Sequence, residues 1–192
     1  MDRQQEPATW AKRNPVMILK IDPSTWRFRQ LGQADREEIE SHLLRLDSSD
    51  RFRRFCAVVT DESITSLLSN LDWRRSLLVG CFVDDVLRGL VHMCDWPDGK
   101  REAELAISVD KACRRSGVAT ALMQSAMRLS AENGIKAVAM IAQPENTPIK
   151  GFAHKLGFSL TDTNNQTFAR LVWNEAARGS IDPPDNLAHR FG

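Results

Sequence analysis

The feature that most constrains the fold of this sequence is a change of hydrophobic period near residue 110. Residues 102–109 alternate more and less apolar side chains, which is the period of a strand with one buried face. From Gly117 to about Asn133 the apolar side chains recur at helical spacing, and Gly134 follows as a helix stop. A strand that passes through a glycine-containing loop into a long helix predicts an α/β fold.

Two amphipathic helices are predicted before this junction. The first begins at Asp35, which forms with Glu38 an aspartate-capped analogue of the capping box, and it ends near Asp47. The second begins behind the cap pair Thr60-Asp61 and carries isoleucine and leucine at helical spacing. The basic, aromatic residues 51–55 between them are interpreted either as a solvated link or as a surface that faces an acidic acceptor.

The remaining segments predict further strands and one short helix. Two apolar runs flank the turn residues Asp84-Asp85 and predict an antiparallel hairpin, to which residues 102–109 add a third strand. The resulting mixed α/β sheet is mostly antiparallel and flanked by helices. Besides 102–109, the predicted strands are 26–31, the hairpin strands 77–83 and 86–94, 137–142 and 168–173, and a short helix is predicted at 146–156.

Length and charge set the domain plan and the classes of partner. The chain has 192 residues, the size of one domain, and its 26 basic and 25 acidic side chains leave a formal charge of +1. This balance does not favour binding to nucleic acid or to an anionic membrane. We expect an N-terminal extension at residues 1–22, one domain at 23–175 and a C-terminal tail at 176–192, with a homodimer left open.

The N-terminal segment and the cysteines bear on the cellular compartment. Residues 1–15 contain no long apolar run, so we expect neither a signal peptide nor a membrane span. The cysteines are widely spaced without a CxxC pair, which favours buried thiols in a cytoplasmic protein over disulfides or a zinc site. They are Cys56, Cys81, Cys94 and Cys113.

The loop before the long helix has the properties of an anion site. The first backbone N–H groups of a helix have no internal partner, and the helix dipole favours negative charge there. Gly117 allows close approach to a ligand, while Arg114 and Arg115 supply cationic donors. The alternative is a solvated basic loop before a surface helix. The expected contact residues are Arg114, Arg115, Ser116, Gly117, Val118, Ala119 and Thr120.

Two motifs resemble those of the GNAT superfamily of N-acetyltransferases. The loop matches its Arg/Gln-x-x-Gly-x-Gly/Ala signature at Arg114, Gly117 and Ala119. A second signature, an asparagine followed by a short helix ending in Lys-Leu-Gly-Phe, is present as Asn146 and the segment 155–158. The resemblance extends from about Trp26 to Trp173.

This resemblance implies a fold, a cofactor and a reaction. The strands at 102–109 and 137–142 are expected to splay into a V that holds the pantetheine of acetyl-coenzyme A. Pantetheine then pairs with main-chain groups around Ile107 and Val109 like an added strand. The pyrophosphate lies on the loop, Asn146 contributes to the cofactor site, and no metal is expected. The implied reaction is transfer of an acetyl group to a primary amine.

Glu104 is the expected general base. An alkylamine with a pKa of about 10.4 is almost wholly protonated near neutral pH and cannot attack a thioester until it loses a proton. Glu104 lies in an Ala-Glu-Leu-Ala segment that is similar to the one in the protein-lysine acetyltransferase branch, where the glutamate is the base. The alternatives are that Glu104 pairs with Lys100 or Arg101, and that Glu102 is the base.

Some features depart from the family pattern and leave the function open. The position where many relatives carry a tyrosine that protonates the thiolate is Ala153, and the chain contains no tyrosine. His154 is turned away by one helical step and is interpreted as a surface residue, and His42 as a rim residue of its helix. The acceptor is a protein lysine or a small amine. The alternative function is a catalytically silent sensor that binds acyl-coenzyme A.

Overall fold

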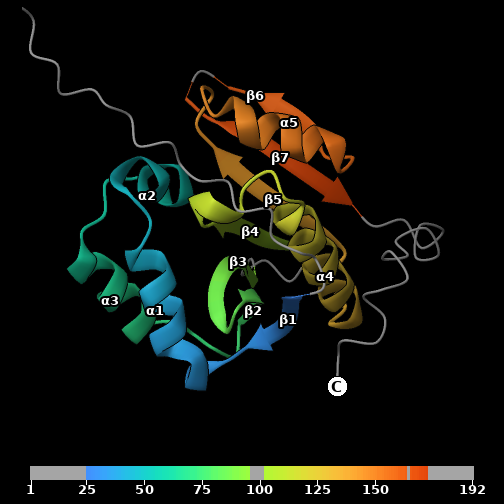
Figure 1. Ribbon diagram of the computed structural model, residues 1–192. Coiled ribbons are helices and arrows are strands. Elements are labelled where there is room, and N and C mark those ends of the chain that lie inside the picture. Colours follow the sequence, from blue (N-terminus) through green and yellow to red (C-terminus); the bar gives the residue numbers. More distant parts are fainter. Residues whose placement is uncertain (1–24, 96–101, 164, 173–192) are drawn as a thin grey trace, which may run out of the picture.

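The computed structural model describes residues 25–95, 102–163 and 165–172. Its centre is a sheet of seven strands in the order β1-β2-β3-β4-β5-β7-β6 (Figure 1). All neighbours pair antiparallel except β4 and β5, which are parallel. The strands are β1 (Trp26–Leu31), β2 (Ser76–Val83), β3 (Val86–Asp95), β4 (Glu102–Val109), β5 (Ala137–Ala142), β6 (Ser159–Asp162) and β7 (Thr167–Val172).

Helices cover both faces of the sheet. On one face lie the three helices that precede β2, and on the other lie the two helices on either side of β5 (Figure 1). The mixed α/β fold expected from the sequence is therefore confirmed. The helices are α1 (Arg36–Leu44), α2 (Ser48–Phe55), α3 (Asp61–Ser69), α4 (Val118–Glu132) and α5 (Thr147–Lys155).

Each face of the sheet has its own hydrophobic core. One core joins α1 and α3 to the sheet and includes Ile39, Leu43 and Ile64, all at most 2% exposed. The other joins α4 and α5 to the opposite face and includes Val118 and Leu122, both fully buried. Burying a side chain of this size contributes about 1.5–3 kcal/mol, so these two cores fix the strands between them.

The local signals for the hairpin and for two helix ends are confirmed. Asp84 and Asp85 both have positive φ, which a two-residue turn between twisted strands requires. Thr60 caps α3 by accepting a hydrogen bond of 3.2 Å from the Ser63 N–H. Gly134, which follows α4, has a φ of 74°.

Two predictions between residues 32 and 56 need correction. Asp35 is the N-cap residue of α1 as predicted, but its side chain makes no capping hydrogen bond, because its carboxylate accepts from the Gly32 N–H and pairs with Arg29 at 2.8 Å. The expected link at 51–55 is part of α2, which has few apolar residues. Asp47 caps this helix through the Asp50 N–H at 2.8 Å.

Several sequence predictions lie outside the described residues. These are the N-terminal extension, the C-terminal tail, the proposed partners Lys100 and Arg101, and Trp173.

Candidate active site

Strands β4 and β5 separate after a short paired segment. Their parallel pairing covers Glu102 with Ala137, Ala103 with Val138, and Glu104 with Ala139. Beyond Glu104 the described residues of β4 have no partner on β5, so the edge of β4 opens. This is the splayed V that the resemblance implies, and it leaves backbone groups on one strand edge available to a ligand.

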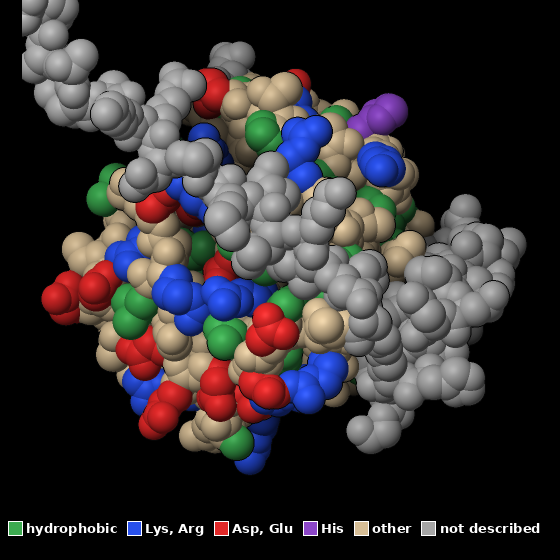
Figure 2. Space-filling view, in the orientation of Figure 1, with side chains coloured by type: hydrophobic (Ala, Val, Ile, Leu, Met, Phe, Trp, Pro, Cys, Tyr) green, Lys and Arg blue, Asp and Glu red, His purple; other side chains and the backbone are tan. Residues whose placement is uncertain are grey.

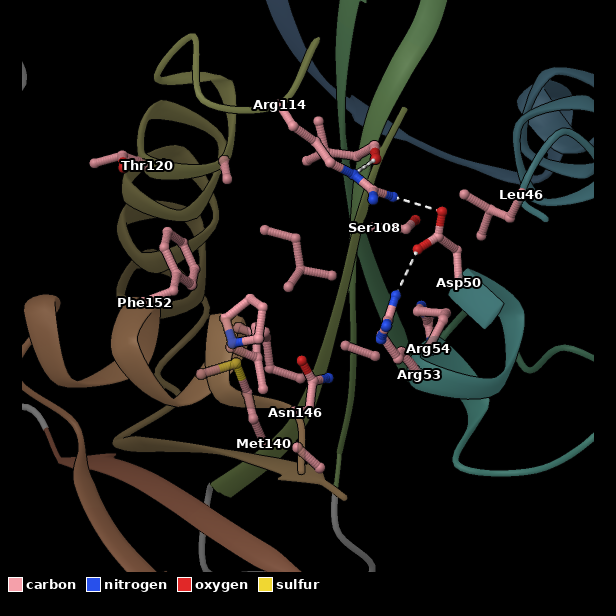
Figure 3. Close-up of a pocket in the computed structure, with 18 of the residues that line it drawn as sticks. Leu46, Asp50, Arg53, Arg54, Ser108, Arg114, Thr120, Met140, Asn146 and Phe152 are labelled. Atoms are coloured by element: carbon pink, nitrogen blue, oxygen red, sulfur yellow. Dashed lines mark hydrogen bonds and ion pairs between the residues drawn. The ribbon is translucent and has the colours of Figure 1, made fainter. Parts of the chain in front are cut away.

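A cavity of about 440 Å³ fills this opening. Its walls come from the open part of β4, the end of β5, the loop before α4, the start of α5, and α2 (Figure 3). In the space-filling view, basic side chains gather beside α1 and α2 (Figure 2). The lining residues used below are Asp50, Arg53, Arg54, Ser108, Arg114, Arg115, Gly117 and Asn146.

The loop before α4 has an unusual backbone at two positions. Arg115 has a φ of 59° and Gly117 a φ of 100°, both in the left-handed region. The first hydrogen bond of the helix runs from the Ala121 N–H to the Gly117 carbonyl at 3.1 Å. The N–H groups of Val118, Ala119 and Thr120 therefore precede the helical ladder, and together with the dipole they favour an anion.

Arg114 is held by the protein itself. Its Nε donates to the Val109 carbonyl at 3.0 Å, and its Nη2 donates to Asp50 Oδ2 at 2.7 Å. Asp50, which is buried, also accepts from Arg53 at 3.4 Å (Figure 3). Arg114 thus joins the loop to α2 and β4. The exposed Arg115 has no recorded ion pair in the described part of the chain, so it is the freer cation of the two.

The structure brings most of the expected cofactor residues into one cavity. Ser116 and Val118 are not among its lining residues: the Ser116 hydroxyl donates to the Cys113 carbonyl at 2.6 Å, and Val118 is fully buried in the core. Those that line the cavity are Ile107, Val109, Arg114, Arg115, Gly117, Ala119, Thr120 and Asn146.

Glu104 lies at the point where the V opens. It is half-buried and does not line the cavity, but it shares a strand face with Ala106 and Ser108, which do. Residues two apart on a strand are separated by about 7 Å, so this carboxylate is next to the cavity. The other candidate base, Glu102, accepts from Arg170 Nη2 at 2.5 Å and is already paired.

Arg54 is a charged lining residue that the sequence placed only within the basic segment 51–55. Its charge acts on Glu104, Cys56 and Cys94. Burial lowers the pKa of Arg54 to about 10. No motif marks it, because its position depends on α2, whose existence the hydrophobic pattern did not indicate.

The prediction for His42 is wrong. This histidine is 0% exposed, and its Nε2 lies 2.8 Å from the Ser108 hydroxyl. Its Nδ1 lies 3.2 Å from Asp110 Oδ1. Burial opposes ionisation of Asp110, but contacts from His42, Arg45 and Arg88 hold the pKa of this carboxyl below its usual value. His42, Ser108 and Asp110 meet because α1 packs against the sheet near the end of β4, so no local pattern could have found them.

The leaving-group side agrees with the sequence in part. Ala153 is 1% exposed and belongs to the hydrophobic core, while His154 is exposed and does not line the cavity.

All four cysteines are free thiols; Cys81 and Cys113 are buried as expected, whereas Cys56 is exposed. Within the described residues, no helix has the length and apolarity to cross a membrane, and no cluster of potential metal ligands occurs.

Solved structures share this fold. The GNAT domain of S. lividans PAT aligns with a TM-score of 0.66 and 17% identity over 76% of this chain and 89% of its own. An N-acetyltransferase from Thermoplasma acidophilum in complex with coenzyme A aligns at 0.57 and 18% over 77% and 99%. A ribosomal L7/L12 α-N-protein acetyltransferase, also in complex with coenzyme A, aligns at 0.60 and 14% over 78% and 94%.

Identities this low show the fold alone, and the family is assigned by a family model. The model described as the acetyltransferase (GNAT) family matches residues 38–158, which is more than half of the 192 residues. The matched segment runs from α1 through Phe158 and contains the splayed strands, the loop and α5. The chain therefore belongs to the acetyltransferase (GNAT) family.

Proposed function

We propose that this protein transfers the acetyl group of acetyl-coenzyme A to a primary amine. The observation that carries the proposal is the single cavity that joins the open edge of β4 to the N-terminus of α4. The pyrophosphate binds the N–H groups that follow Gly117, helped by Arg115. Pantetheine lies along the edge of β4 at Ile107 and Val109, and it reaches toward Glu104.

Glu104 acts as the general base in this proposal. The amine attacks the thioester carbon directly within a ternary complex, and Glu104 takes its proton directly or through one water molecule. Support comes from the position of Glu104 at the apex of the V, beside lining residues on the same strand face. Glu102 is less suited, because Arg170 already occupies its carboxylate.

The acceptor is proposed to be a protein lysine or a small amine. The Ala-Glu-Leu-Ala segment at 103–106 favours the lysine. A silent acyl-coenzyme A sensor is the second candidate, favoured by one observation. The position expected to hold a tyrosine is a buried alanine, Ala153, which cannot protonate the leaving thiolate.

A panel of peptides and small amines, assayed for coenzyme A thiol release, tests these candidates. Acetyl transfer predicts release that depends on both acetyl-coenzyme A and one class of amine. Cofactor binding in a calorimeter with no amine-dependent release across the panel would support the sensor. Absence of both binding and release would exclude the acyl-coenzyme A site.

A further inference from the structure

Ser108, His42 and Asp110 lie in a row beside the cofactor cavity and form what we call the relay. The Ser108 hydroxyl lies 2.8 Å from His42 Nε2, and Asp110 Oδ1 lies 3.2 Å from His42 Nδ1. All three residues are at least nine-tenths buried. A carboxylate at Nδ1 favours the imidazole tautomer with its proton there, so that Nε2 is free to accept the serine proton.

The carboxylate of this relay is itself held in place. Asp110 Oδ2 accepts from Arg88 Nη1 at 3.2 Å and from Arg45 Nη2 at 3.5 Å, which leaves Oδ1 facing the imidazole. Among the described residues, Nδ1 has no acceptor in line with its N–H. Such loosely aligned contacts are common in ligand-free catalytic sites and tighten in the reacting complex.

The serine end of the relay opens into the cavity. Ser108 is one of the lining residues, on the β4 wall next to Asp50 in Figure 3. It lies between Ile107 and Val109, whose main chain is proposed to pair with pantetheine. A buried polar group with a purely structural role can be enclosed completely by the core. A nucleophile must be accessible from the ligand cavity.

We propose that Ser108 is a nucleophile for acetyl-coenzyme A and that the protein therefore has a second activity, hydrolysis of this thioester when no amine is bound. The proposal rests on the acetyl-coenzyme A site proposed above. Direct attack by the amine and attack by Ser108 are alternative fates of the same bound thioester.

The hydrolytic reaction has two steps. Ser108 Oγ attacks the thioester carbon while His42 Nε2 takes the hydroxyl proton; the C–S bond then breaks, and His42 gives that proton to the departing thiolate. The products are coenzyme A and an acetyl ester on Ser108. Water then attacks the ester, passing one proton to His42, which returns it to Ser108 Oγ as acetic acid leaves and gives its own proton to the solvent.

The test follows thiol release from acetyl-coenzyme A by the full chain without amine, together with peptide mass spectrometry after an acid quench. We expect acetylation of Ser108 and slow thiol release that Ser108→Ala lowers by about a hundredfold or more. Ser125→Ala is the matched control, because Ser125 is also buried and, within the described residues, its hydroxyl donates to the Ala121 carbonyl on α4 and to nothing else. It should release thiol at the wild-type rate.

The adduct measurement needs no variant, so a folding defect in a His42 substitution does not affect it. Amine-dependent transfer without any acetyl on Ser108, and with acceptor-free release unchanged in Ser108→Ala, would overturn the relay while leaving the proposed function intact. If coenzyme A does not bind at all, the proposed function fails. In that case p-nitrophenyl acetate serves as the acetyl donor. A nitrophenolate burst that requires Ser108 supports Ser108 as the nucleophile, and absence of the burst overturns it.

Discussion

At the scale of single residues, the candidates for catalysis and binding are the side chains that the fold does not already pair with another group. Glu102 and Arg114 are engaged, the first by Arg170 and the second by Asp50. Among the described residues, no ion pair or side-chain hydrogen bond engages Glu104 or Arg115, and Arg54 acts on Glu104 only through its charge. The sequence offered both Arg114 and Arg115 as cationic donors to the phosphate, and because Arg114 is engaged by Asp50 we propose that Arg115 makes the contact.

Replacing Glu104 by glutamine should lower amine-dependent turnover by about a hundredfold or more, because the amine then loses its base. The defect should shrink as the pH rises, since a larger share of the amine is already neutral. Steady-state rates from neutral to alkaline pH, with calorimetric coenzyme A affinity as the control, check this. A constant defect at every pH, or one explained by cofactor affinity, would contradict the assignment.

At the scale of elements, α2 shows what the sequence could not reveal. Its only apolar residues are Phe52 and Phe55, and it is held by the Asp47 cap and the ion pair that joins its Asp50 to Arg114 in the loop before α4. Strands and helices with clear periods, such as β4 and α4, were predicted to within about a residue. Contacts between distant segments leave no local pattern, so α2 and the relay of His42 with Ser108 were missed.

Arg114→Ala should lower the free energy of unfolding by about 1–2 kcal/mol, because the buried Asp50 keeps only its longer contact to Arg53. Urea denaturation of this variant beside Arg115→Ala checks the effect. Arg115→Ala should unfold like the wild type but bind coenzyme A about tenfold more weakly. If Arg115→Ala lowered the stability and Arg114→Ala weakened coenzyme A binding instead, the phosphate contact would be assigned to Arg114.

At the scale of the whole molecule, two cores hold a sheet that is open at one place only among its described strand pairs, between β4 and β5. Buried polar groups such as Asp50, Ser108 and Asp110 belong to neither core. His92, on β3, is half-buried, with Nε2 at 3.2 Å from the Ser76 hydroxyl.

We predict that the protein loses stability in mild acid because of His92. Burial, with a contribution from Arg54, lowers the pKa of His92 from 6.5 to about 4. Between these values the unfolded chain binds a proton that the folded chain does not, so stability falls as the pH drops from about 6.5 to 4, by about 3 kcal/mol. Urea unfolding at several pH values should show this loss, and His92→Gln should largely remove it. An equal slope in both proteins would contradict the assignment to His92.

The most direct test of the central claim is calorimetric titration of coenzyme A into the wild type, Gly117→Val and Gly32→Val. At Gly117 the φ of 100° and the N-terminus of α4 meet, so a branched side chain must distort the backbone that binds the pyrophosphate. Gly32 has a φ of −133° and open space around it, so the same change there is a fair control. We predict that Gly117→Val stays folded and loses at least about 100-fold in affinity, while Gly32→Val binds like the wild type. Equal affinity in all three proteins would show that the cofactor does not bind at this loop.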